Sequence, residues 1–151
     1  MTQPLMTDTK NSDPKQSDML SQVREQELYR DALAHGLDYL SNVNERAVFP
    51  GPLALRQLSD FDEPLSEQGE DATGTLELLN RTGAPATVAQ TGCRYFGFVT
   101  GGALPASLSA RILGDFWDQN AAMQASSPLA AKLEQVCEAW LRELFGLHDR
   151  F

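Results

Sequence analysis

The sequence has few of the side chains that most often act as nucleophiles, bases or metal ligands. Its 151 residues include two cysteines and two histidines. Cys93 and Cys137 lie in no Cys-x-x-Cys or Cys/His pattern, so neither a zinc site nor a disulfide framework is predicted. His35 and His148 belong to no recognisable catalytic motif, and a lone histidine on a helix is more often structural than a ligand. The acidic loop 60–65 lacks the ligand spacing of a calcium loop, so no metal is expected.

The chain also lacks an excess of positive charge and any long apolar run. Its formal net charge is −9 at pH 7, and the 12 basic residues are scattered, whereas a phosphate-binding face needs clustered Lys and Arg. No run approaches the length of a membrane span, and the first residues do not resemble a signal peptide. We therefore expect a cytoplasmic protein that binds neither nucleic acid nor a membrane.

What the sequence does hold is a succession of helical patterns. Residues 1–21 are polar, and we expect a disordered leader there. Apolar residues recur at helical spacing over 22–41, and residues 53–58 suit one short helical turn. Ser66 is a good N-cap for a helix that should run to about Asn80. The expected fold is mostly α, with at most one or two short strands.

Two further helices are predicted in the last third of the chain. Pro105 suits a first helical position, and residues 105–119 are apolar almost all round. Such a helix is buried on most sides, inside a large core or a subunit interface, and a chain of this length has little material to bury it. Ser127 and Pro128 begin the last helix, which ends at Gly146 and carries an apolar stripe. The pattern indicates missing partners.

The most informative stretch is residues 93–106, which opens with three aromatics in four residues. It continues into Thr100, Gly101 and Gly102 ahead of the helix at Pro105. Consecutive glycines allow positive φ or the close approach of another molecule, so one interpretation is the wall of a ligand pocket. The alternative, which sequence physics favours, is a buried edge strand and a tight turn. From residue types alone, we predict a helical module without an active site.

A set of short motifs runs in order through residues 61–147. They are Phe61-Asp62-Glu63-Pro64-Leu65, Arg94-Tyr95-Phe96-Gly97-Phe98-Val99-Thr100-Gly101-Gly102, Leu104-Pro105-Ala106, Trp117-Asp118-Gln119-Asn120, Ser127-Pro128, and Leu133-Glu134 leading to Trp140-Leu141. In order and spacing they resemble the N-terminal part of the group II pyridoxal-phosphate-dependent amino acid decarboxylases. This family includes the aromatic amino acid, glutamate, histidine, diaminobutyrate and sulfinoalanine decarboxylases, and the matched region covers more than half of the chain.

The resemblance implies the N-terminal segment of a carboxy-lyase of amino acid metabolism with the aspartate aminotransferase-like, fold type I, α/β architecture. Residues 22–151 would be its helical segment, and the large cofactor-binding domain would follow Phe151. Members are homodimers, and this region forms much of their interface. The family releases the α-carboxylate of an amino acid as CO2, while pyridoxal 5′-phosphate takes up the electrons. None of Lys10, Lys15 and Lys132 looks like the cofactor lysine, so the segment alone is expected to be inactive.

The resemblance also assigns site residues. The segment that matches Phe98, Val99 and Thr100 lines the substrate pocket in the family. It implies a hydrogen bond from Thr100 near the substrate carboxylate and an apolar wall from Phe98 and Val99, for which core packing is the alternative. The loop around Ala122 and Met123 is implied to reach the site of the partner subunit. No catalytic residue is expected within this segment.

Two departures from the family pattern concern the substrate. This sequence has Gly92-Cys93 where the aromatic decarboxylases carry His-Pro, and one residue more near Ala122. The identity of the amino acid, and the choice between decarboxylation and oxidative deamination, therefore stay open. The alternative to an enzyme segment is a stand-alone, non-catalytic helical dimerisation module. A downstream lysine that binds the cofactor would favour the enzyme.

Overall fold

The computed structural model describes residues 14–67, 69–100 and 102–147. Within these ranges all regular structure is helical and no strand is present, so the prediction of a mostly α chain is confirmed. The same residues contain no helix that is long and apolar enough to span a membrane. The chain divides into two compact units, residues 1–102 and 103–151. Lys10, Gly101 and His148 lie outside the described residues.

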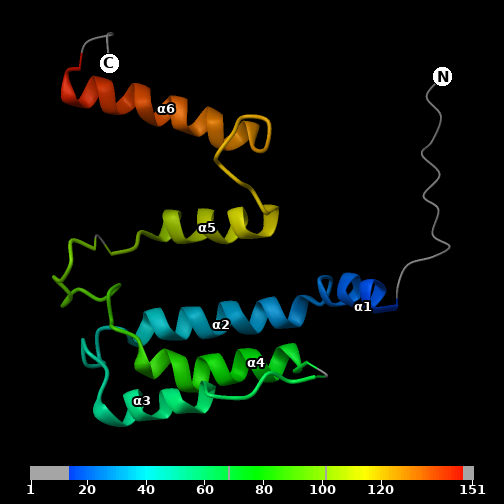
Figure 1. Ribbon diagram of the computed structural model, residues 1–151. Helices are drawn as coiled ribbons and strands as arrows, with labels where there is room; N and C mark the ends of the chain where they lie inside the picture. The colour runs from blue at the N-terminus through cyan, green and yellow to red at the C-terminus, as the bar shows by residue number, and fades with distance from the viewer. Residues whose placement is uncertain (1–13, 68, 101, 148–151) are drawn as a thin grey trace, which may run out of the picture. The chain divides into compact units, whose positions relative to one another are not determined.

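The first unit holds four α-helices and three short irregular helices (Figure 1). The α-helices are α1 (Pro14–Gln22), α2 (Gln26–Asn42), α3 (Pro52–Gln57) and α4 (Ala72–Leu78). The short ones are the 3-10 helix η1 (Leu58–Phe61), the π-helix η2 (Leu79–Gly83) and the 3-10 helix η3 (Ala84–Ala86). α4 packs against α2, α3 packs against η3, and η1 packs against η2. The short helix expected near residues 53–58 is thus confirmed.

Helix α1 lies within the stretch where we expected a disordered leader. It spans Pro14–Gln22, and its described side chains from residue 16 onward are all exposed. The remainder of the expected leader, residues 1–13, lies outside the described residues. The predicted helix over 22–41 corresponds to α2, which begins at Gln26.

Helix α4 begins later than the sequence predicts. We expected Ser66 to be its N-cap, but Ser66 instead donates its hydroxyl to the carbonyl of Gly69 within a loop, at 3.2 Å. Asp71 is the N-cap, and its carboxylate accepts from the N–H of Gly74 at 3.0 Å. A carboxylate satisfies this unpaired donor and also complements the positive end of the helix dipole, which a neutral hydroxyl does not.

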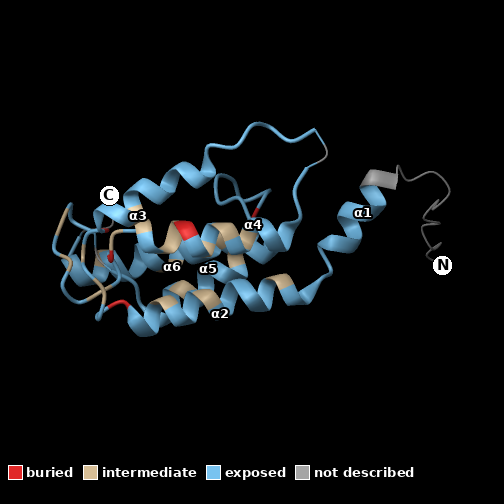
Figure 2. Ribbon diagram, turned by 90° about the horizontal axis from the view of Figure 1, so that it is seen from below, coloured by how far each residue is buried: buried red, intermediate tan, exposed pale blue. Residues whose placement is uncertain are grey.

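Very few side chains of the first unit are buried. Among its described residues, the buried ones are Val43, Pro50, Thr82 and Ala89 (Figure 2). The facing sides of α2 and α4 are half-buried, whereas an apolar row on α2 at helical spacing is exposed. That row consists of Leu33, Leu37 and Leu40. Most apolar surface of this unit is therefore left uncovered by the part of the chain that the structure describes.

The second unit consists of α5 (Pro105–Trp117) and α6 (Pro128–Phe145). Both helix starts agree with the sequence prediction. At the start of α6 the Ser127 hydroxyl accepts from the N–H of Ala130 at 3.3 Å, and at its end Gly146 takes a left-handed φ of 61°. These ends are confirmed because the residues that define them act locally.

The expected burial of α5 is not found within the chain. No residue of α5 or α6 is buried, and large apolar side chains on both helices are about half exposed or more, including Leu113, Trp117, Leu133 and Trp140. The sequence analysis expected this chain to hold little material that could bury α5, and no residue of α5 is buried. Burial in a subunit interface stays a prediction.

Candidate functional site

The segment around residues 92–100 is anchored by a pair of arginines, which we call the arginine junction. Arg46 donates from one guanidinium nitrogen, Nη2, to the carbonyl oxygens of Ala84, Pro85 and Thr87, at 2.8, 3.1 and 3.3 Å. The same guanidinium lies over the ring of Tyr39, 4.8 Å from its centroid. Arg46 thus ties the chain after α2 to the chain after η2.

Arg94 completes the arginine junction from the opposite direction. It donates from Nη2 to the carbonyl oxygens of Asn44, at 2.7 Å, and of Arg46. The Asn44 side-chain oxygen in turn accepts from the N–H of Cys93 at 3.0 Å. Because hydrogen bonds from a charged donor are stronger than neutral ones, these contacts fix the point where the aromatic segment leaves the helices.

Gly92 allows the chain around residues 43–44 and the chain around residues 89–92 to approach each other closely. A Cβ at this position would lie 3.2 Å from the carbonyl oxygen of Ala89, 3.3 Å from Asn44 Oδ1 and 3.4 Å from Val43 Cγ2. The sequence departs from the aromatic decarboxylases at this glycine. The structure indicates that a larger residue would push the neighbouring chain away.

Residues 97–100 form a tight turn. The N–H of Thr100 donates to the carbonyl of Gly97 at 3.3 Å, and the two central residues, Phe98 and Val99, have φ values of 51° and 59°. Positive φ at both central positions is the pattern of a type I′ turn, which normally takes Asn and Gly. A β-branched residue such as Val99 is a genuine outlier in this conformation.

The turn presents its two central side chains outward. Phe98 is 94% exposed and Val99 is fully exposed. The edge strand that sequence physics favoured is therefore wrong, and the tight turn is confirmed. Core packing of these two residues within this chain is also wrong. What remains is an apolar tip, defined here as the side chains of Phe98 and Val99, facing away from the unit that holds it.

Thr100 directly follows the apolar tip. Its hydroxyl donates to the carbonyl of Gly97 at 3.2 Å, so its proton is used within the turn while its oxygen is left able to accept. The side chain is exposed. The three residues for which the sequence resemblance implies a place in the substrate pocket thus share one exposed turn.

Ala122 and Met123 lie in the second unit, in the loop between α5 and α6. The N–H of Ala122 donates to Asn120 Oδ1 at 2.9 Å. The carbonyl of Met123 accepts from the N–H of Ser126 at 3.0 Å and from that of Ser127 at 3.1 Å. The backbone of this loop is thereby held in place, and the side chain of Met123 is exposed.

A groove in the first unit was missed by the sequence analysis. Its volume is about 560 Å³, and we call it the α2–η2 groove because most of its polar residues come from these two helices. It is lined by His35, Asp38, Tyr39, Asn42, Arg46, Ala47, Phe49, Pro50, Gly51, Asn80, Arg81, Ala84 and Pro85. No sequence pattern predicts this groove, because its lining residues come from three separate stretches of chain.

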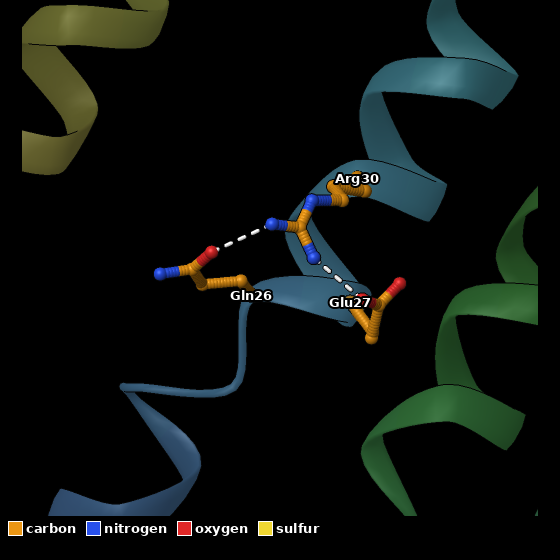
Figure 3. A network of polar contacts seen from close by, with 3 residues as sticks. All are labelled: Gln26, Glu27 and Arg30. Atoms are coloured by element: carbon orange, nitrogen blue, oxygen red, sulfur yellow. Dashed lines mark hydrogen bonds and ion pairs between the residues drawn. The ribbon is translucent and has the colours of Figure 1, made fainter.

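One polar cluster outside the groove is purely local. Arg30 donates to Gln26 Oε1 at 2.7 Å and pairs with Glu27 at 2.5 Å, all within the first turns of α2 (Figure 3). Such i,i+3 and i,i+4 contacts stabilise a helix surface. The guanidinium of Arg30 is held by its own helix, and Arg30 does not line the α2–η2 groove.

The described residues do not fit a covalently held pyridoxal phosphate. Such a cofactor needs a lysine in a shielded pocket, but Lys132 is exposed on α6, and none of the described residues that line the α2–η2 groove is a lysine. Within the same residues, no group of three or more His, Cys, Asp or Glu side chains is placed to hold a metal. Cys93 and Cys137 are exposed free thiols.

No family model, curated protein or solved structure matches the chain. The resemblance to the group II decarboxylases therefore depends on the ordered motifs of residues 61–147. A function drawn from those motifs is a proposal.

Proposed function

We propose that the chain is the N-terminal segment of a pyridoxal-phosphate-dependent amino acid decarboxylase. Its role there is to supply dimer surface and one wall of the substrate pocket. The observation that carries the proposal is the apolar tip: Phe98 and Val99 are held outward by a strained turn, in the segment that the motifs assign to the pocket. Exposed aromatic and β-branched side chains on a rigid turn suit contact with another molecule.

The uncovered helices support the proposed dimer surface. α5 and α6 have no buried residue, and most of their large apolar side chains are exposed. Apolar surface of this extent is covered in obligate dimers, whose interfaces resemble a domain core cut in half. A two-fold dimer uses the same patch on both subunits, so one set of helices serves both.

The part played by this chain in the reaction is binding and orientation. When bound, pyridoxal phosphate supplies the electron sink for loss of CO2. Phe98 and Val99 exclude water from one side of the substrate, and the Thr100 hydroxyl, which donates to the Gly97 carbonyl in the free chain, donates to the substrate carboxylate instead. The loop with Ala122 and Met123 reaches the site of the partner subunit. The segment by itself is inactive, since it provides no cofactor lysine.

The native protein tests this proposal. We would isolate it from its source cell, measure its intact mass, and assay cofactor-dependent release of CO2 from amino acids. A mass well above 16.6 kDa together with CO2 release is expected. A mass near 16.6 kDa without CO2 release would overturn the enzyme function.

Thr100 tests the pocket within the active enzyme. Thr100→Val removes the hydroxyl while keeping the shape. It should lower kcat/KM by an amount that corresponds to about 1–3 kcal/mol of activation free energy, the cost of a lost hydrogen bond to a charged group. Thr100→Ser is the matched control, because it keeps the hydroxyl, and it should retain most of the activity. Unchanged kinetics in Thr100→Val would remove this residue from the site.

The second candidate is a stand-alone helical dimerisation module. The observation that favours it is that α5 and α6 have no buried residue, and a dimer surface of this kind requires no active site. A mass near 16.6 kDa for the single chain made by the cell, sedimentation as a dimer and no CO2 release would support this module.

A further inference from the structure

We infer that the α2–η2 groove binds the carboxylate of a small organic acid with an apolar body. The groove lies wholly in the first unit and does not include the apolar tip, so this inference is independent of the proposed decarboxylase function. Its volume of about 560 Å³ falls within the range of about 300–1,000 Å³ that small-molecule sites occupy.

The charges of the groove favour an anion. Arg81 is exposed, and within the described part of the chain it has neither a hydrogen bond nor an ion pair. Arg46 donates from Nη2 to backbone carbonyls, and no carboxylate among those residues pairs with it. In a chain whose net charge is −9, the groove has two guanidinium groups against the single carboxylate of Asp38.

A carboxylate suits the guanidinium of Arg81, which has its nitrogens available. The planar guanidinium fork matches the two oxygens of a carboxylate, which gives two parallel hydrogen bonds. Arg46 contributes a fixed positive charge rather than a fork, because backbone carbonyls occupy its Nη2 and it lies over the Tyr39 ring. Arg81 is the group left free to close on the ligand.

The remaining lining favours an apolar body. Phe49 is 64% exposed and lines the groove beside Pro50 and Pro85. An exposed aromatic ring next to a charged group is a common arrangement in small-molecule sites, where apolar walls take up the body and a few polar groups fix its orientation.

The π-helix η2 places the polar residues at the groove. Asn80 and Arg81 are consecutive residues of η2, and π-turns occur frequently at functional sites. The Asn80 amide lies 3.0 Å from His35 Nδ1. When Asn80 donates this bond, the proton of the neutral imidazole is on Nε2. His35 then adds a neutral donor for the acid to the two charged groups.

Acids of this kind come from two sources, amino acids and acids without an ammonium group. Asp38 is the group that would pair with an ammonium, and only its hydrogen bond from Asn42 Nδ2, at 3.0 Å, occupies it. The experiment therefore uses three probes with the same aromatic body. They are 3-phenylpropionate, L-phenylalanine and 2-phenylethylamine, which carry a carboxylate, both charges, and an ammonium alone.

The test is titration of the 151-residue chain with each probe, followed by amide and His35 ring signals in NMR. We expect 3-phenylpropionate to shift the signals of His35, Arg81 and Gly51 and to saturate, while 2-phenylethylamine has no effect. Tighter binding of L-phenylalanine that Asp38→Asn reduces to the level of 3-phenylpropionate supports a carboxylate site for amino acids. Equal or weaker binding of L-phenylalanine supports a site for acids without an ammonium.

Arg81→Gln is the decisive variant. It should weaken 3-phenylpropionate binding about 10-fold, the scale of one lost charge-assisted hydrogen bond. Arg56→Gln is the matched control, because Arg56 is also exposed in the first unit but lies outside the groove lining, and binding should be unchanged. The inference is overturned if no probe with a carboxylate binds, if 2-phenylethylamine binds equally well, or if Arg81→Gln, shown to be folded by its amide spectrum, binds as the parent does.

Discussion

Replacing Arg46 by methionine should destabilise the first unit more than any other single surface change. Methionine keeps the unbranched apolar stem as far as the position of Nε, so the substitution mainly removes the guanidinium. That group donates to the carbonyls of Ala84, Pro85 and Thr87 and lies over Tyr39. The loss therefore leaves three backbone carbonyls without this donor, of which the contact to Ala84 is part-buried and those to Pro85 and Thr87 are exposed.

The size of the effect follows from the geometry. One nitrogen, Nη2, carries two protons, so at most two of the three contacts of Arg46 are strong at once. Hydrogen bonds from a charged donor contribute about 1.5–3 kcal/mol each, and an exposed cation–π contact about 0.5–1 kcal/mol. Because the side chain is only half-buried, we take the lower ends and expect about 3 kcal/mol. Small domains unfold with about 5–15 kcal/mol, so this is a large fraction.

Two measurements check this prediction. Urea unfolding followed by far-UV circular dichroism gives the change in free energy, and exchange of the Ala89 amide, which donates to Val48 at 2.9 Å, reports on the arginine junction itself. Arg46→Lys keeps the charge but not the fork and should lose less. Arg56→Met, at an exposed position, should change stability by less than about 0.5 kcal/mol. If Arg46→Met matched Arg56→Met, the junction would not be what holds this unit together.

Three further predictions concern backbone fit. Gly92→Ala should destabilise the chain by about 1–3 kcal/mol in the same urea experiment, since its methyl would lie 3.2 Å from a carbonyl oxygen. Gly36→Ala is the control: it lies in open space on α2 and should stabilise the chain by about 0.5–1 kcal/mol. Ser127→Ala should cost about 0.5–2 kcal/mol and speed amide exchange in the first turn of α6, and an unchanged rate would show that the cap is unimportant. Phe98→Asn combined with Val99→Gly should raise the urea midpoint of the isolated chain, and a lowered midpoint would contradict the left-handed turn.

Local signals made part of the fold predictable. Pro105 and Ser127 mark the starts of α5 and α6, and Gly146 marks the end of α6, because each satisfies or omits a backbone donor within one turn of itself. Asp71 also acts within one turn, but Ser66 offered the same kind of signal earlier in the chain. The loop contact that Ser66 makes with Gly69 decided between them.

The arginine junction had no signal of this kind. Arg46 and Arg94 bond to backbone carbonyls that are 38 to 50 residues away in sequence. A carbonyl is present on every residue, so sequence carries no pairing rule for such contacts. The α2–η2 groove depends on the same long-range arrangement and was missed for the same reason. The turn at Phe98 and Val99 was obscured because the glycines that usually mark positive φ come later in the segment.

The composition of that turn has a consequence for function. Left-handed backbone at Phe98 and Val99 costs about 1–3 kcal/mol per residue, and their exposed side chains recover none of it from this chain. Asn and Gly would take the same turn with little strain. Covering both Phe98 and Val99 would contribute about 1.5–3 kcal/mol of apolar burial for each side chain, which is of the size needed to offset the strain at the two residues. A molecule that covers the tip would therefore stabilise a turn of this composition, which is what the proposed pocket wall requires.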